Sequence, residues 1–139
     1  MFDRCLYFNI NALTRVVNRI WAKAFEKYEL SPAHGYMLRV VLSNPGISQK
    51  QLANELRLEK STITRSVDAL QKKGFVIRKT GHTSDAREHS LYATEQAKAI
   101  QTELETLGDD LYQTMKSKIG SENLKLLVYE LREASRKLE

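Results

Sequence analysis

The middle third of the chain restricts the fold more than any other feature, because its pattern changes there from helical to extended. Ser48-Gln49-Lys50-Gln51 is a capping box, whose first and last side chains pair with backbone N–H groups where a helix begins. A longer helix should follow over residues 60–73, because Gly74 suits the position after a helix end. Residues 75–79 and 89–93 are rich in strand-forming side chains. Two helices and a β-hairpin in this order predict a winged helix-turn-helix.

The helix expected over residues 60–73 has an apolar side and a polar side. Ile63, Val67 and Leu70 recur at helical spacing, so they should be buried. The opposite side and its flanks carry Ser61, Thr62, Thr64, Arg65, Asp68 and Lys72. The DNA major groove admits one helix, and arginine, serine and threonine can bond bases or phosphates there. A polar helix face by itself is usually only solvated, but the neighbouring helix and hairpin favour contact with double-stranded DNA.

The formal net charge of +5 is unevenly distributed along the chain. Residues 48–93 carry nine Lys and Arg against five Asp and Glu, whereas residues 94–139 carry seven against nine. A basic centre beside an acidic C-terminal third suggests that the centre meets a polyanion. Charge alone leaves chance asymmetry as an alternative, because net charge is only a footprint of nucleic-acid binding.

Long apolar stripes mark both ends of the chain. Residues 6–28 place apolar side chains at alternating steps of four and three, and residues 97–115 and 124–138 do the same. Ser121 is expected to cap the last of these helices. The striped helices could pack together within one chain or interleave with a second copy, since most soluble oligomers are symmetric dimers. Periodicity alone leaves both arrangements open.

Residues 45–53, residues 60–78 and the short motif Asp85-Ala86-Arg87 carry a resemblance to a known family. The two stretches are similar to the recognition core of MarR-type transcriptional regulators, and the motif is similar to the Asp-x-Arg of their wing. After the second strand the family usually has Leu-Thr-x-x-Gly, whereas this chain has Ala93-Thr94-Glu95-Gln96-Ala97. Thr94 can still cap the helix that follows.

The resemblance implies a fold class and a division of the chain. The fold would be mainly α with a small β-hairpin wing, formed as one domain over residues 1–139. Residues 1–30 and 97–139 are implied to be dimerisation helices, and residues 31–93 a winged helix-turn-helix DNA-binding region. In the family the first and last helices of two subunits interdigitate, so that two recognition helices meet one pseudo-palindromic site.

The helix face and the resemblance together give a set of residues expected to contact DNA. They are Ser48, Lys50, Lys60, Ser61, Thr62, Thr64, Arg65, Lys72, Asp85 and Arg87. Asp85 can orient the guanidinium of Arg87 by charge-assisted hydrogen bonds, and arginine suits a narrow minor groove. A surface ion pair is the plainer interpretation of these two residues. We expect a sequence-specific regulator that acts as a homodimer on a pseudo-palindromic operator, with repression as its mode.

Family members commonly release DNA when a small phenolic ligand binds between the dimerisation helices and the winged domain. The residues that could line such a crevice are Trp21, Phe25, His34, Tyr36 and Met37. Each of them could instead belong to the apolar core. Other members sense oxidants through a cysteine in the first helix, so a redox-sensing regulator that uses Cys5 is an alternative. A buried free cysteine more often packs as a small hydrophobe.

The sequence also excludes several classes of protein. A single cysteine cannot form an internal disulfide or a cysteine-based zinc site. The three histidines fall in no metal-ligand spacing, and no nucleophile motif or glycine-rich phosphate loop is present, so we expect no enzyme, metal or cofactor. No apolar run approaches the ~18 residues that cross a membrane, and no signal peptide is recognised, so we expect a cytoplasmic protein. A helical protein that binds only other proteins would explain the apolar stripes but not the basic face.

Overall fold

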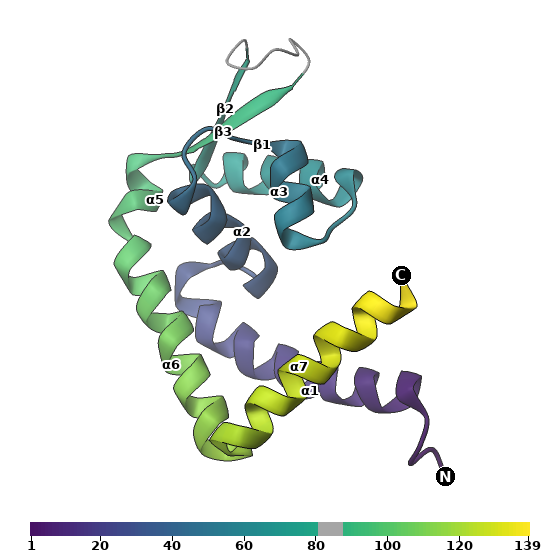
Figure 1. The fold of residues 1–139 in the computed structure, drawn as a ribbon. Helices are drawn as coiled ribbons and strands as arrows, with labels where there is room; N and C mark the ends of the chain where they lie inside the picture. Colours follow the sequence, from purple (N-terminus) through teal and green to yellow (C-terminus); the bar gives the residue numbers. More distant parts are fainter. Residues whose placement is uncertain (81–87) are drawn as a thin grey trace. The chain divides into compact units, whose positions relative to one another are not determined.

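The computed structural model describes residues 1–80 and 88–139, and Figure 1 shows their arrangement as helices with one small sheet. The chain divides into two compact units, residues 1–104 and residues 105–139, which we describe separately. In chain order the elements are α1 (Leu6–Phe25), the 3-10 turn η1 (Glu26–Tyr28), α2 (Pro32–Ser43), β1 (Ile47–Ser48), α3 (Gln49–Leu56), α4 (Lys60–Lys72), β2 (Val76–Thr80), β3 (His89–Ala93), α5 (Glu95–Ala99), α6 (Gln101–Ile119) and α7 (Ser121–Leu138). The expected fold class, mainly helical with a small β wing, is confirmed.

The sheet of the first unit has three antiparallel strands in the order β1-β3-β2. The two expected strands are confirmed, β3 at the predicted bounds and β2 one residue later than predicted. The third strand, β1, was not predicted, because two residues are too few to give an alternating pattern. Ile47 of β1 pairs with Leu91, and Val76 of β2 pairs with Ala93. The short β1 therefore joins the start of α3 to the hairpin.

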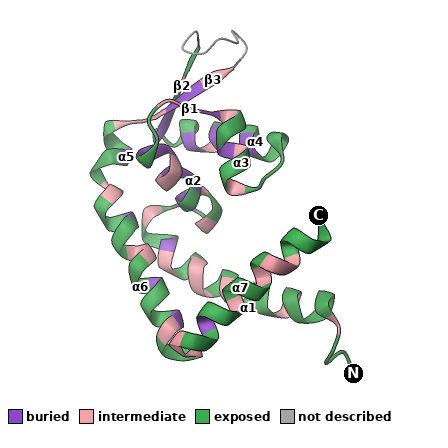
Figure 2. Ribbon diagram, viewed as in Figure 1, coloured by how far each residue is buried: buried purple, intermediate pink, exposed green. Residues whose placement is uncertain are grey.

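The core of the first unit lies between α2, α3, α4 and the sheet (Figure 2). Its fully buried side chains include Leu38, Val41, Leu52, Ile63, Val67, Leu70 and Leu91. Each such side chain stabilises the fold by roughly 1.5–3 kcal/mol relative to leaving it exposed. The buried faces of α3 and α4 thus pack on a close-packed apolar core, which fixes the position of their exposed faces.

Helix ends in this unit follow the sequence signals. Ser48 begins α3 with the predicted capping box: its hydroxyl accepts the N–H of Gln51 at 3.0 Å, and the Gln51 side chain accepts the N–H of Ser48 at 3.0 Å. At the end of α4, Gly74 has a φ of +82°, which side chains disfavour. Phe75 N–H donates to the Leu70 carbonyl and Gly74 N–H donates to the Gln71 carbonyl, which is a Schellman motif.

The second unit, residues 105–139, contains the rest of α6 and all of α7. Gly120 lies between the helices with a φ of +97° and occupies the N-cap position of α7 without a side-chain cap. The expectation that Ser121 caps this helix is wrong: the glycine turn brings the chain into helical geometry one residue earlier. Several large apolar side chains of this unit are exposed, namely Tyr112, Leu126, Val128, Tyr129 and Leu138. Within residues 1–80 and 88–139, no helix has the length and apolar character needed to cross a membrane.

Candidate nucleic-acid interface

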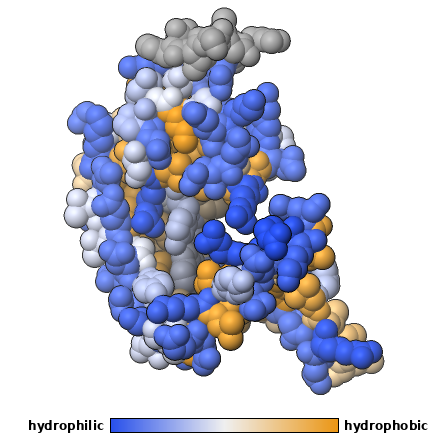
Figure 3. Space-filling view, in the orientation of Figure 1, coloured by the Kyte–Doolittle hydropathy of each residue, from blue (hydrophilic) through white to orange (hydrophobic). Residues whose placement is uncertain are grey.

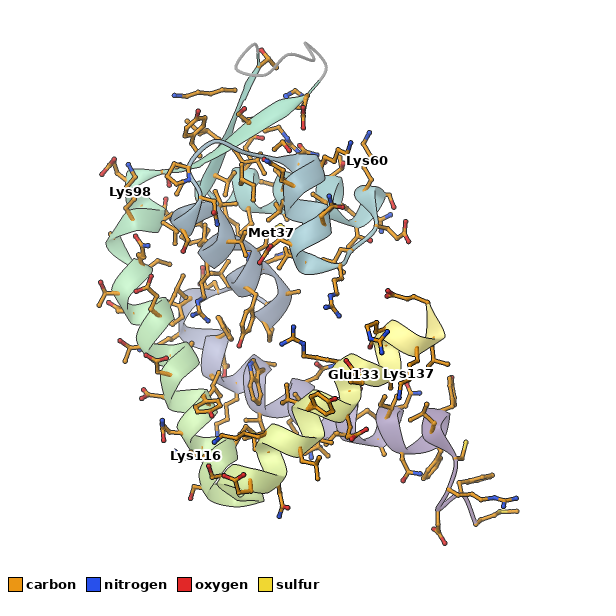
Figure 4. The ribbon with its side chains drawn as sticks, viewed as in Figure 1. Met37, Lys60, Lys98, Lys116, Glu133 and Lys137 are labelled. Atoms are coloured by element: carbon orange, nitrogen blue, oxygen red, sulfur yellow. The ribbon has the colours of Figure 1, made fainter. Side chains whose placement is uncertain are left out.

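The polar face of α4 lies at the surface of the first unit. Ile63, Val67 and Leu70 are fully buried, as the helical spacing predicted. The predicted contact residues on this helix are all exposed: Lys60, Ser61, Thr62, Thr64, Arg65 and Lys72. Lys60 lies at the start of the helix (Figure 4), and hydrophilic residues dominate the visible surface around α3 and α4 (Figure 3). The arrangement presents hydroxyls and cations on one surface helix.

A groove of about 900 Å³ runs along this helix, between α3, α4 and the strands β2 and β3. It is lined by Gln49, Lys50, Lys60, Thr64, Asp68, Arg78, Glu88 and His89. The Gln49 amide of α3 donates to the Thr64 hydroxyl of α4 at 3.3 Å, which ties the two helices together across the groove. Four basic side chains or imidazoles therefore line the groove beside two carboxylates.

Arg78 of β2 is the centre of this region, and the sequence did not single it out. Its guanidinium donates to Gln49 at 2.9 Å, to Gln71 at 2.6 Å and to the Thr64 carbonyl at 3.3 Å, and pairs with Asp68 at 2.5 Å. Its side chain is only 17% exposed. The sequence did contain one indication that Arg78 is buried: in an extended strand it shares a face with the apolar Val76, two residues earlier.

Four of the predicted DNA contacts lie outside α4. Ser48 is buried, 5% exposed, and its hydroxyl is engaged in capping α3, so it does not lie on the exposed face. Lys50, in the first turn of α3, is exposed beside the groove. Asp85 and Arg87 lie outside the described residues.

Of the five residues expected to line a ligand crevice, Trp21, Phe25 and Tyr36 lie together, and the ring centroids of Phe25 and Tyr36 are 5.9 Å apart. Trp21 and Tyr36 meet: the indole N–H donates to the Tyr36 hydroxyl at 3.0 Å. Phe25 and Met37 are fully buried and belong to the core, the alternative left open above. A Cβ on Gly35 would lie 2.3 Å from the ring of Phe25, so that ring fills the space against α2.

His34 lies on a different side of α2, because successive helical residues point about 100° apart. It lines a cavity of about 300 Å³ with Thr62, Arg65, Ser66 and Ala69 of α4. Burial and, to a lesser extent, the nearby charge of Lys73 lower the pKa of His34 below its ordinary value. His34 therefore belongs to the surroundings of α4 rather than to the Trp21–Tyr36 contact.

Cys5 is half-buried and occupies the N-cap position of α1. Its carbonyl accepts the side-chain amide of Asn9 at 2.8 Å, a contact that fixes the start of the helix. Across the described ranges, no cluster of three or more His, Cys, Asp or Glu side chains is arranged to hold a metal ion.

Comparisons with known proteins agree with the winged-helix geometry of residues 1–80 and 88–139. Residues 28–88 match the model of the MarR family. A protein of Thauera aromatica, described as a transcriptional regulatory protein for the hcr operon, is 40% identical over 58 residues, which are 42% of this chain and 34% of that protein. The match to this curated relative therefore covers about a third of the relative's length.

Two solved structures extend the similarity to nearly the whole chain. MepR of S. aureus, solved as a DNA complex, has a TM-score of 0.85 at 15% identity and covers 99% of this chain and 100% of its own. The transcriptional repressor CouR, bound to a 23-mer DNA duplex, has a TM-score of 0.84 at 21% identity, covering 96% and 94%. Identities this low show a shared fold. Residues 28–88 are therefore similar to the MarR family, and the chain as a whole shares the winged-helix fold of these two solved structures.

Proposed function

We propose that this chain is a transcriptional regulator that binds specific double-stranded DNA with α4 in the major groove. The observation that carries the proposal is the exposed face of α4, which presents Ser61, Thr64 and Arg65. The opposite face of the same helix is apolar and fully buried, so it fixes the helix on the core. Arginine can pair with guanine O6 and N7, and the hydroxyls can bond bases or phosphates. MepR and CouR, which share this fold, were both solved bound to DNA, which supports DNA binding by this chain.

The proposed active form is a homodimer on a pseudo-palindromic operator. Support comes from apolar side chains that each unit leaves exposed: Leu6, Tyr7, Phe8, Leu13 and Val16 on α1, and Leu126, Val128 and Tyr129 on α7. A second copy would bury them, since large exposed apolar patches usually mark an interface. Two-fold symmetry would then place the two half-sites about one helical turn, ~10 base pairs, apart.

The wing and the mode of regulation complete the proposal. Asp85 and Arg87, which lie outside the described residues, are proposed to reach the minor groove next to each half-site. Repression is the proposed mode, as for the transcriptional repressor CouR. The proposed location is the cytoplasm, as the sequence led us to expect. A small aromatic effector is proposed to act near Trp21 and Tyr36, both of which are partly exposed. MarR family members, which residues 28–88 resemble, are regulators rather than enzymes, and we propose no catalytic role.

Selection from a pool of random duplexes tests the proposal without knowledge of the operator. The purified chain should enrich one inverted repeat, and Arg65→Ala should enrich a motif with weaker preference at one position of each half. Enrichment without any common motif would show binding to the phosphate backbone alone. Failure to retain duplexes even at low salt would leave a helical protein that binds other proteins as the better account.

A further inference from the structure

We propose that Arg78 is a positioning residue for DNA recognition, which holds α4 at the rotation that aims its exposed face at the bases. The inference rests on the proposed function and adds to it a residue outside the recognition helix. Arg78 lies on β2, and its side chain is mostly buried between α3, α4 and the sheet. Its effect on DNA would pass through the groups that it holds.

The contacts of Arg78 fix α4 along one side. The guanidinium reaches the carbonyl of Thr64, the carboxylate of Asp68 and the side chain of Gln71, which follow one another at steps of four and three. Residues at this spacing share one side of a helix. A rigid group bonded to all three opposes rotation of the helix about its own axis.

The same guanidinium also fixes α3 relative to α4. Its Nε donates to the side-chain oxygen Oε1 of Gln49 at 2.9 Å, and the side-chain amide N–H of Gln49 in turn donates to the Thr64 hydroxyl at 3.3 Å. Gln49 is the first residue of α3, directly after the capping box. Arg78 therefore links one strand and two helices through a single side chain.

Only arginine can make this set of contacts. Its planar fork carries five N–H donors in fixed directions, whereas lysine has one compact ammonium on a flexible stem. Lysine at this position would keep the positive charge but could not bond Gln49 and the three groups of α4 together. Substitution by lysine therefore separates geometry from charge.

Arg78 also compensates a charge that would otherwise oppose DNA. The carboxylate of Asp68 is 62% exposed and lies beside Thr64 and Lys60 in the groove. An unpaired carboxylate there would repel phosphates. The ion pair with Arg78, at 2.5 Å, neutralises it while leaving the hydroxyls and Arg65 exposed.

The test is Arg78→Lys, assayed against a selected operator and a shuffled duplex at several salt concentrations. We expect affinity for the operator to fall by about fivefold to a hundredfold, the range set by losing one good base contact. Affinity for the shuffled duplex should stay within about twofold, because it depends on net charge, which lysine preserves. Arg136→Lys is the matched control: Arg136 also pairs with a carboxylate, Glu133, at 2.9 Å, but on α7.

Asp68→Asn keeps the test decisive if Arg78→Lys folds poorly. It removes one partner of Arg78 and should lower the ratio of operator to shuffled affinity, while affinity for the shuffled duplex rises. Circular dichroism and thermal unfolding establish that each variant is folded. An unchanged ratio in both variants would overturn the inference, and equal losses on both duplexes would make Arg78 a phosphate contact instead. A wild-type protein that does not prefer the operator would overturn the proposed function itself, and the inference with it.

Discussion

At the scale of single residues, Arg65 and Arg87 are assigned different tasks on DNA. Arg65 is exposed on α4, where a guanidinium can reach base edges. Arg87 was assigned to the wing from the Asp-x-Arg motif and from the position of that motif between the two predicted strands, and its placement lies outside the described residues. Base contacts specify a sequence, whereas phosphate contacts position the protein on the duplex. Removal of each arginine should therefore change DNA binding in a different way: one should alter base preference and the other the salt dependence of affinity.

Arg65→Ala should weaken operator binding by about 1–3 kcal/mol and relax preference at one base pair of each half-site. The reason is the loss of a bidentate base contact. Fluorescence anisotropy against a panel of single-base operator variants measures both effects. A uniform loss across the panel would mean that Arg65 contacts phosphate only.

Arg87→Ala should weaken binding to many sequences alike and lower the salt slope by about one per subunit, because one phosphate is no longer neutralised. Anisotropy over a range of salt concentrations gives the slope. Asp85→Ala should act in the same direction but less strongly, since it only frees the guanidinium. A change in base preference without a change in slope would contradict this assignment.

The partial burial of His34 predicts that the free energy of unfolding depends on pH. Burial lowers its pKa, so the folded protein resists protonation that the unfolded chain accepts near pH 6.5. Above that pH the imidazole is neutral in both the folded and the unfolded state, so it does not change the free energy of unfolding. As pH falls below it, the unfolded chain takes up a proton first and stability drops. The melting temperature should decrease from pH 7.5 to 5.5, and decrease less in His34→Gln; equal decreases would exclude His34 as the cause.

At the scale of elements, local signals predicted most of the helices and strands. The capping box at Ser48, the glycine after α4 and the buried stripe of Ile63, Val67 and Leu70 all have local causes, and all were confirmed. The short β1 and the cluster around Arg78 were missed, because each depends on partners far along the chain. Long-range pairing leaves little trace in one sequence without its tertiary context.

Ser48→Ala tests whether this residue acts as a cap rather than as a DNA contact. Loss of the capping box should destabilise the protein by about 0.5–2 kcal/mol. Chemical denaturation measures the change, with Ser43→Ala, at an exposed position near the end of α2, as the control. Affinity for DNA should fall little once the variant is folded. A large loss of affinity with unchanged stability would restore Ser48 to the interface.

At the scale of the whole molecule, the proposed dimer depends on apolar surface that one chain leaves uncovered. Leu13 is 37% exposed on α1, so a charge placed there need not be buried in an isolated subunit. In a dimer the same charge would lose its water without gaining a partner. The periodicity predicted the apolar stripe but could not choose between an internal bundle and a second copy, because both bury the same pattern; only the family resemblance favoured the second copy.

Leu13→Asp should convert the dimer to folded monomers that bind the operator far more weakly. Sedimentation velocity at micromolar concentration reports the oligomeric state, and circular dichroism reports folding. Asn18→Asp adds the same negative charge to an exposed position of α1 and should remain dimeric. A wild-type protein that sediments as a monomer would contradict the proposed assembly.

The central claim is that this chain recognises a DNA sequence through α4, and the most direct measurement is the ratio of two affinities. The dissociation constant for the selected operator is compared with that for a shuffled duplex of equal length, at physiological salt. We predict a ratio of about 10³ or more, the range of specific DNA-binding proteins, and its reduction in Arg65→Ala. A ratio near one, or a ratio that Arg65→Ala leaves unchanged, would contradict the account.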